Sequence, residues 1–492
     1  MVGFEKHSLM PVFRVFSEDA LDAIHSASLE VLEKTGVRIH HGESILKMLK
    51  DNGCNVDFEK GVVRFPSYVV EEAVKKIPKI YVMYGRNPKY DCKVDGRHVY
   101  FTTDTETPNT VDLQTGEWRP STMDDLEKLT RVADALDSIA SGGHLTTSLD
   151  KPNNVRCLYD YAAALNNTEK PCGWSVYPPE LAMKLADYQL EITTAVAGNE
   201  KKLKDRPLIR GGFCTESPLK FEGRYVEIAL KLAKLGFPCG VASMPLGGAT
   251  APVTLAGSLV ITNAEVLSGV CTVQLASPGT NMGVSYIMGN LNMKTGLWGQ
   301  GPEEGLLCAG AAELARHYGF RTTVLGFNTA CKMSGAQASY EKTMSTLLPV
   351  LAGADIVYQA GSLEGGMAAS FEELVMDDEI CKAVLKAVQG IEVNDETLAI
   401  DVIDKVGPGG HFLAEKHTLN HFKESLFFSE LTDRHSYDAW KKTGGKSMVK
   451  RARERAEEIL KEHWPTPLDK DVQKEISEII ERAEKELPKT TL

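Results

Sequence analysis

The sequence lacks closely spaced cysteines. No two of its 10 cysteines lie within ten positions of each other, which excludes a zinc knuckle and a CxxC redox pair. Glycine and proline, at 42 and 22 of 492 residues, are too few for a collagen-like or low-complexity chain. We therefore expect a globular protein with reduced thiols and no bound metal.

The sequence also lacks a basic run, a signal peptide and an uninterrupted apolar span. Its 55 basic and 67 acidic residues give a net charge of −12, which argues against a nucleic-acid partner. Residues 1–16 have neither the apolar core nor the small-residue cleavage site of a secretory signal. Asn263 and Glu265 interrupt the most apolar stretch, 252–275, so we expect a buried helix there and no membrane partner. These features predict a cytoplasmic protein.

Short β-rich runs alternate with helical stretches from residue 98 to residue 388. Such alternation predicts parallel strands, and eight units favour a closed (β/α)8 barrel over an open doubly wound sheet. We expect an α+β cap over 1–97, the barrel over 98–390 and a helical extension over 391–492. The expected strands are 98–103, 138–143, 171–176, 207–213, 237–243, 281–287, 321–327 and 355–361.

Aromatic and polar residues lie at the ends of these strands, where a barrel places its active site. Aromatic faces attract a quaternary ammonium in a water-poor pocket, so the set favours a cation-binding site. The alternative is that each ring fills a layer of the barrel. The residues are Asp104, Glu106, His144, Trp174, Tyr177, Phe213, Cys214, Glu216, Met244, Tyr286, Asn290, Phe327, Asn328 and Glu364.

Four long runs resemble one known family, the trimethylamine methyltransferases. They are PLGGATAPVTLAGSLVITNAEVLSGV (245–270), QASYEK (337–342), VGPGGHFLAEKHTL (406–419) and DRHSYDAW (433–440). The resemblance covers nearly the whole chain. It implies a (β/α)8 enzyme that moves a methyl group from a methylated amine to the cobalt of a separate corrinoid protein, without binding the corrinoid stably itself and without a metal of its own.

One segment departs from the family pattern. Archaeal trimethylamine enzymes carry pyrrolysine near the segment that matches 326–332, which here contains only standard residues. Thr329 and Ala330 also stand where the family has an aspartate before an Ala/Ser-Lys pair. The chain therefore resembles the pyrrolysine-free branch, whose members demethylate quaternary amines. Glycine betaine is the expected donor, with proline betaine, carnitine or another betaine as alternatives.

The resemblance and the strand-end residues together give a site hypothesis. An aromatic box grips the trimethylammonium group, and cationic or N–H donors hold the carboxylate of the betaine. Glu216 and Glu364 add negative potential, the loop 289–301 docks the corrinoid protein, and the charged C-terminal helices contact a second copy of the chain in a homo-oligomer. The box is Trp174, Tyr177, Phe213, Tyr286 and Phe327, and the carboxylate donors are His144, Arg210 and Lys332.

Two rival functions stay open on the sequence. A barrel lyase using Glu216 and His144 as acid and base would turn over without a corrinoid protein. A betaine-binding protein would hold the ligand but transfer no methyl group.

Overall fold

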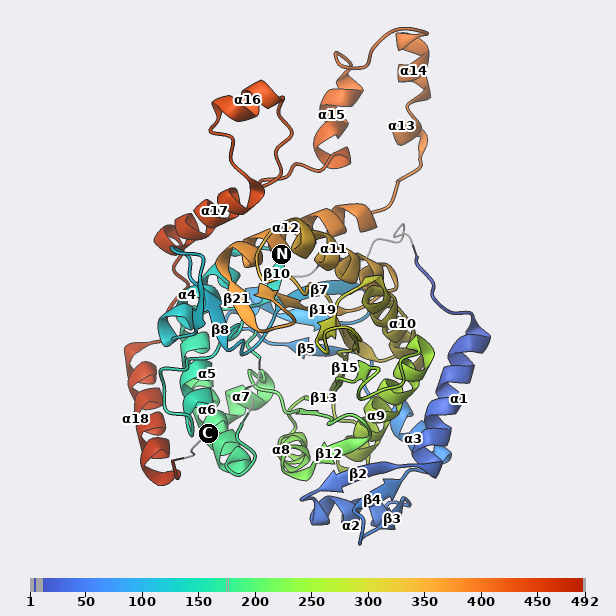
Figure 1. The fold of residues 1–492 in the computed structure, drawn as a ribbon, viewed down its shortest axis with the longest axis vertical. Coiled ribbons are helices and arrows are strands. Elements are labelled where there is room, and N and C mark those ends of the chain that lie inside the picture. The colour runs from blue at the N-terminus through green and yellow to red at the C-terminus, as the bar shows by residue number, and fades with distance from the viewer. Residues whose placement is uncertain (1–3, 6–11, 174, 176, 490–492) are drawn as a thin grey trace.

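The computed structural model describes residues 4–5, 12–173, 175 and 177–489 (Figure 1). At its centre, the described residues form an eight-stranded sheet in which all strands but β1 (Phe4–Glu5) run parallel. The parallel strands lie in the order β10, β7, β19, β18, β15, β13, β11. Their bounds are β7 (His98–Thr103), β10 (Ile139–Ser141), β11 (Phe213–Cys214), β13 (Cys239–Ser243), β15 (Met282–Tyr286), β18 (Arg321–Leu325) and β19 (Ile356–Ala360).

The prediction of a mixed α/β fold with parallel strands is confirmed. The expected strand at 171–176 differs, because residues 171–173 and 175 join no ladder. Pro171 has no N–H to donate and Gly173 weakens a strand, so this segment makes a poor ladder partner. It still lies beside β10, where the Ser141 hydroxyl donates to the Pro171 carbonyl at 2.7 Å.

Helices follow the strands as the sequence predicts and surround the sheet (Figure 1). Glu265 on α9 accepts hydrogen bonds from the Thr215 and Ser243 hydroxyls, which ties the ends of β11 and β13 to this helix. The helices are α4 (Met123–Ala135), α5 (Arg156–Asn167), α6 (Ala182–Ala197), α7 (Glu200–Asp205), α8 (Gly223–Lys234), α9 (Leu255–Ala276), α10 (Pro302–Tyr318), α11 (Ala336–Leu351) and α12 (Phe371–Val388).

Helix α9 is the one helix of the described chain long and apolar enough to cross a membrane. Its most apolar window is 78% buried inside the protein. The prediction of a buried helix over this stretch is therefore confirmed, with Asn263 and Glu265 satisfied by internal hydrogen bonds.

Small elements cover both ends of the sheet. The N-terminal part packs helices on a four-stranded sheet, and the hairpin β5–β6 lies next to β7. Two further small sheets follow the carboxyl ends of the strands. The N-terminal elements are α1 (Glu18–Lys34), β2 (Val37–His40), α2 (Glu43–Asp51), β3 (Asn55–Asp57), β4 (Val62–Arg64), α3 (Ser67–Lys75), β5 (Tyr81–Met83), the 3-10 helix η1 (Pro88–Tyr90) and β6 (Cys92–Val94), with β12 (Lys220–Glu222) pairing β2. The others are β8 (Asn109–Val111), β9 (Trp118–Pro120), β14 (Leu246–Gly247), β16 (Gly289–Leu291), β17 (Trp298–Gly299), β20 (Ser362–Leu363) and β21 (Ala368–Ser370).

The C-terminal region has two parts. Four short helices project away from the body at the top of Figure 1, and none of them contains a buried residue. The last two helices return to the body, where α17 packs on α12 and α4, and α18 packs on α6 and α5. The elements are α13 (Asp395–Leu398), α14 (Ile400–Val406), α15 (Lys416–Ser425), α16 (Tyr437–Lys442), α17 (Met448–Glu462) and α18 (Lys470–Glu486).

Candidate functional site

The parallel strands have one face toward the helices and one face toward the interior of the sheet. Val241 touches the helix side, since a Cβ on Gly269 of α9 would meet it at 2.5 Å, and Ser243 bonds Glu265 of the same helix. Because successive residues of a strand point to opposite faces, Gly240 and Ala242 face the interior. The ladder places Cys214, Ala242, Ser285 and Thr323 on one level, each facing inward.

The inward side chains are small and in contact with solvent. Ala242, Ser285 and Thr323 are partly exposed, whereas their helix-facing neighbours Val241 and Val284 are fully buried. This alternation along β13 and β15 means that the interior is not filled by side chains. A solvent-accessible space lies inside the sheet.

A hairpin closes the N-terminal end of this space. Tyr81 and Met83 of β5 pack in one hydrophobic cluster with the inward-facing Tyr100 and Ile356. Arg210 faces inward on the approach to β11, and its Nη1 lies 3.4 Å from the Met83 sulfur. Among the described residues it forms no ion pair, so its positive charge is available at the floor of the space.

Carboxylates lie at the opposite end, just beyond the carboxyl end of β7. Asp104 is 4% exposed and accepts a 2.6 Å hydrogen bond at Oδ1 from the Tyr358 hydroxyl. The same hydroxyl lies 3.1 Å from Thr105 Oγ1. Asp104 Oδ2 is buried and has no hydrogen-bond partner in the described chain. Burial, together with the nearby charge of this carboxylate, raises the pKa of Tyr358 well above its usual value.

Glu106 forms a second acidic point at the same end. Its Oε1 lies 3.3 Å from Nε2 of the fully buried His144, which follows β10. Burial raises the pKa of Cys214 to about 11, and the nearby charge of Glu106 adds to the shift. Burial is the main cause of the raised pKa of Tyr177, to which the charge of Glu106 adds a small part. Glu106 and His144 therefore meet at this end, whereas Tyr177 packs in a hydrophobic cluster with residues of α5 and α6.

Three rings of the predicted aromatic box lie on the helix side of the sheet instead. Phe213 packs on Phe221 with centroids 5.3 Å apart. The Tyr286 hydroxyl donates to Asn263 Oδ1 of α9 at 3.3 Å, and Phe327 packs on Phe101. All of them are at most 1% exposed, and Trp174 lies outside the described residues. The structure therefore does not bring these rings together around the interior; they occupy the core beneath the helices.

The remaining predicted polar residues pair at the rim. Glu216 forms an ion pair with Lys220 across a tight turn. Lys332 pairs with Glu364 at 3.2 Å. Both pairs are substantially exposed, so neither adds an unpaired charge to the interior.

A separate polar cluster lies beneath the segment 326–332. Glu304 is 1% exposed and accepts hydrogen bonds from Trp298 Nε1 at 2.8 Å and Asn328 Nδ2 at 3.0 Å. Burial raises the pKa of Glu304 to about 8. Thr329 Oγ1 and Ala330 N both donate to Glu341 of α11, at 2.5 and 3.0 Å. The segment is thus held by two buried carboxyl groups.

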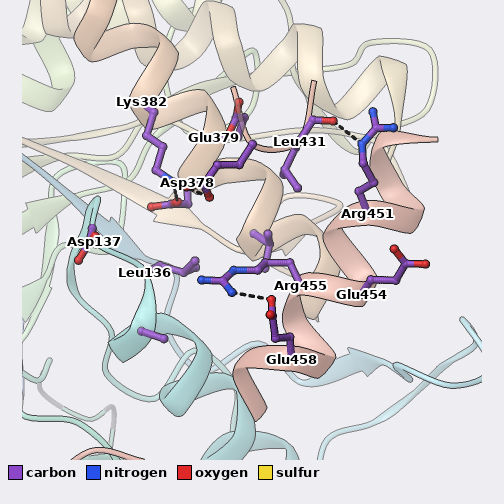
Figure 2. Close-up of a pocket in the computed structure, with 13 residues that line it drawn as sticks. Leu136, Asp137, Asp378, Glu379, Lys382, Leu431, Arg451, Glu454, Arg455 and Glu458 are labelled. Carbon is purple, nitrogen blue, oxygen red and sulfur yellow. Dashed lines mark hydrogen bonds and ion pairs between the residues drawn. The ribbon is translucent and has the colours of Figure 1, made fainter. Parts of the chain in front are cut away.

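A surface pocket lies elsewhere, between α12, α17 and α4 (Figure 2). It has a volume of about 510 Å³ and is lined mainly by charged side chains. Lys382 pairs with Asp378 at 3.0 Å and Arg455 with Glu458 at 2.6 Å, so these charges already satisfy one another. None of the predicted site residues lines this pocket.

One protein family matches this chain along most of its length. The family "Trimethylamine methyltransferase (MTTB)" matches residues 5–488. A trimethylamine methyltransferase MttB of Desulfitobacterium hafniense is 37% identical over 473 residues, covering 96% of this chain and 94% of that protein. A glycine betaine methyltransferase of D. hafniense is 30% identical over 482 residues, covering 97% and 99%. The solved monomethylamine methyltransferase MtmB of Methanosarcina barkeri aligns with a TM-score of 0.46 at 11% identity, covering 92% of this chain and 88% of that one.

Proposed function

The chain belongs to the trimethylamine methyltransferase family, and we propose that it moves a methyl group from a quaternary amine to the Co(I) of a separate corrinoid protein. Glycine betaine is the proposed donor. The observation that carries this proposal is the polarity of the interior, with Arg210 at the floor and the carboxylates of Asp104 and Glu106 at the mouth. A betaine carries a carboxylate at one end and a quaternary ammonium at the other, so its charges are complementary to those at the floor and the mouth.

The polarity also gives the orientation of the donor. The cobalt of a partner protein approaches from the open end, so the methyl groups must face the mouth. The trimethylammonium then lies near Asp104 and the partly exposed ring of Tyr358, and its positive charge is complementary to both. The carboxylate points inward to Arg210, which has the fork geometry suited to carboxylate binding.

This reaction makes few chemical demands on the chain. Co(I) supplies the electron pair of the new bond to carbon, and the nitrogen keeps the pair of the broken C–N bond, so that the leaving group is dimethylglycinate, with a neutral tertiary amine and its carboxylate unchanged. No proton moves and no covalent intermediate on the protein is needed. Positioning and charge complementarity are therefore the contributions expected of these residues.

The segment 326–332 supports a quaternary donor over trimethylamine. Pyrrolysine stands near this segment in the archaeal enzymes, whereas here Thr329 is buried and bonded to Glu341. Neither Thr329 nor Ala330 presents a reactive group to an amine. A tertiary amine is a poorer methyl donor than a quaternary one and would lack that assistance.

Four further expectations belong to the same proposal. Residues 171–173 and 175 fill the position between β10 and β11 and close a (β/α)8 barrel, with 1–97 as a cap and 391–492 as an extension. The hairpin β16–β17, whose tip exposes Met293 and Leu297, docks the corrinoid protein. The protein is cytoplasmic, and it assembles as a homo-oligomer.

The test mixes the purified protein with its corrinoid partner in the Co(I) state and follows the cobalt absorbance. Glycine betaine, proline betaine, carnitine and trimethylamine are supplied in separate reactions. Methylation by a betaine but not by trimethylamine supports the proposal, and the fastest betaine identifies the donor. Methylation by trimethylamine alone would overturn it. Binding of a betaine without any methyl transfer would support the betaine-binding alternative, and conversion without the corrinoid would support a lyase.

A further inference from the structure

The projecting C-terminal helices bring two histidines and a carboxylate together. His417 and His421 lie one turn apart on α15, with ring centroids 4.4 Å apart. Both contact Glu396 of α13: the Nε2 atom of His417 lies 3.1 Å from its carbonyl oxygen, and the Nε2 atom of His421 lies 2.9 Å from its Oε1. One ligand atom from each residue lies within 4.8 Å of the others.

We propose that Glu396, His417 and His421 form a site for a divalent transition-metal ion, with Zn²⁺ as the ion it holds. Imidazole nitrogen and carboxylate oxygen are zinc ligands, at bond lengths near 2.0–2.2 Å. Tetrahedral ligands at those bond lengths are about 3.3 Å apart, so the side chains need only small rotations to coordinate the ion. Water completes the fourth position, because the three residues lie at the surface.

A bound ion at this position would stabilise the projecting helices. Helices α13 to α16 contain no buried residue, and each has at most 10 residues. Helices this short are marginal without tertiary packing. Polar ties such as the Lys405–Glu415 ion pair at 2.6 Å hold α14 to α15. A metal bridging α13 and α15 would supply the cross-link that small segments without a core require.

The location separates this ion from methyl transfer. The three ligands belong to the projecting helices, whereas Tyr358 lies in a strand of the central sheet and Asp104 and Arg210 lie next to its strands (Figure 1). The proposed metal site therefore does not depend on the proposed reaction, and each can be tested without the other. Its sequence signal is the four-residue spacing of His417 and His421; Glu396, 21 positions earlier than His417, joins them only in the folded chain.

The test uses the tag-free full-length chain. After dialysis against trace Zn²⁺, plasma mass spectrometry measures the bound metal, and a chromophoric chelator measures the affinity. We expect one Zn²⁺ per chain. In His417→Ala and in His421→Ala the zinc affinity should fall by more than about 100-fold, because even the loss of a residue that only hydrogen-bonds a metal ligand lowers metal affinity by about 10–100-fold. His411→Ala, a histidine of the same region outside the cluster, is the matched control and should retain the ion.

A second readout follows the fold of the region. Limited proteolysis should cut the native chain between 391 and 447 faster after chelation, and His421→Ala should be cut at the fast rate with or without Zn²⁺. Absence of zinc from the native chain, or equal affinity in the native chain and both alanine variants, would overturn the proposal. An equal loss of zinc affinity in His411→Ala would also overturn it, because the ion would then not be bound specifically by the cluster at Glu396.

Discussion

Asp104→Asn tests the charge at the mouth of the interior. The variant keeps an oxygen that can accept the hydrogen bonds from Tyr358 and the Thr105 N–H, at 2.6 and 2.8 Å, so the local structure should persist. What it removes is a negative charge on a residue that is only 4% exposed. At a separation of about 5 Å and an effective dielectric constant of about 20, that charge is worth about 3 kcal/mol to a bound cation. We expect kcat/KM for glycine betaine to fall by about 100-fold.

The decisive comparison uses 3,3-dimethylbutyrate, in which carbon replaces the charged nitrogen of glycine betaine. This inhibitor has the same shape and carboxylate but no positive charge, so its inhibition constant should stay the same or improve in Asp104→Asn. Asp401→Asn, an exposed residue of the projecting helices, makes the same change in net charge and is the control. Equal weakening of both ligands, or unchanged betaine kinetics in a folded variant, would refute the role of Asp104.

Three other predictions concern the interior and its supports. Arg210→Met should raise KM for glycine betaine about tenfold or more but leave binding of choline, which has no carboxylate, unchanged; equal losses for both would indicate misfolding. Ala242→Leu should fill the interior and abolish turnover with little change in Tm, whereas Ala264→Leu, buried on α9, should lower Tm. Glu304 has its pKa raised to about 8, so the native state binds a proton that the unfolded state releases near 4.5, and stability should fall as pH rises across that window by up to about 1.4 kcal/mol per pH unit. Urea unfolding at several pH values should show this slope in the native protein and a flatter one in Glu304→Gln.

The helices and most strands follow from apolar periodicity, but the facing of the strand residues does not. A parallel strand covered on both sides reads as a continuous apolar run, so the sequence does not reveal which alternate residues face inward. That is why Phe213 and Tyr286 are expected in the pocket and occur beneath the helices; Phe327, two residues after β18, packs there as well. Only the ladder register, which pairs Tyr358 with Thr102, shows that Tyr358 faces inward.

The polar residues that follow β7 and β10 are easier to place, because the ends of these strands point to the mouth. Asp104, Glu106 and His144 all come directly after strands and all lie at that end. Arg210 lies before its strand, and its place at the floor depends on the β5–β6 hairpin, which no local pattern predicts. Long-range packing against that hairpin therefore decides which cation the interior presents.

Under the proposed function, the small residues between the two charged ends would set which betaine can be used. The inward level of Cys214, Ala242, Ser285 and Thr323 separates Arg210 from the carboxylates at the mouth, and these residues offer little side-chain volume. A donor must span this gap so that its carboxylate reaches the guanidinium while a methyl group stays at the open end. A donor that is too short loses one of the two charged contacts, and one that is too long moves its methyl group out of line with the cobalt. Enlarging an inward residue should therefore disfavour bulky betaines such as proline betaine before it disfavours glycine betaine, so donor preference is governed by the neutral layer as well as by the charges.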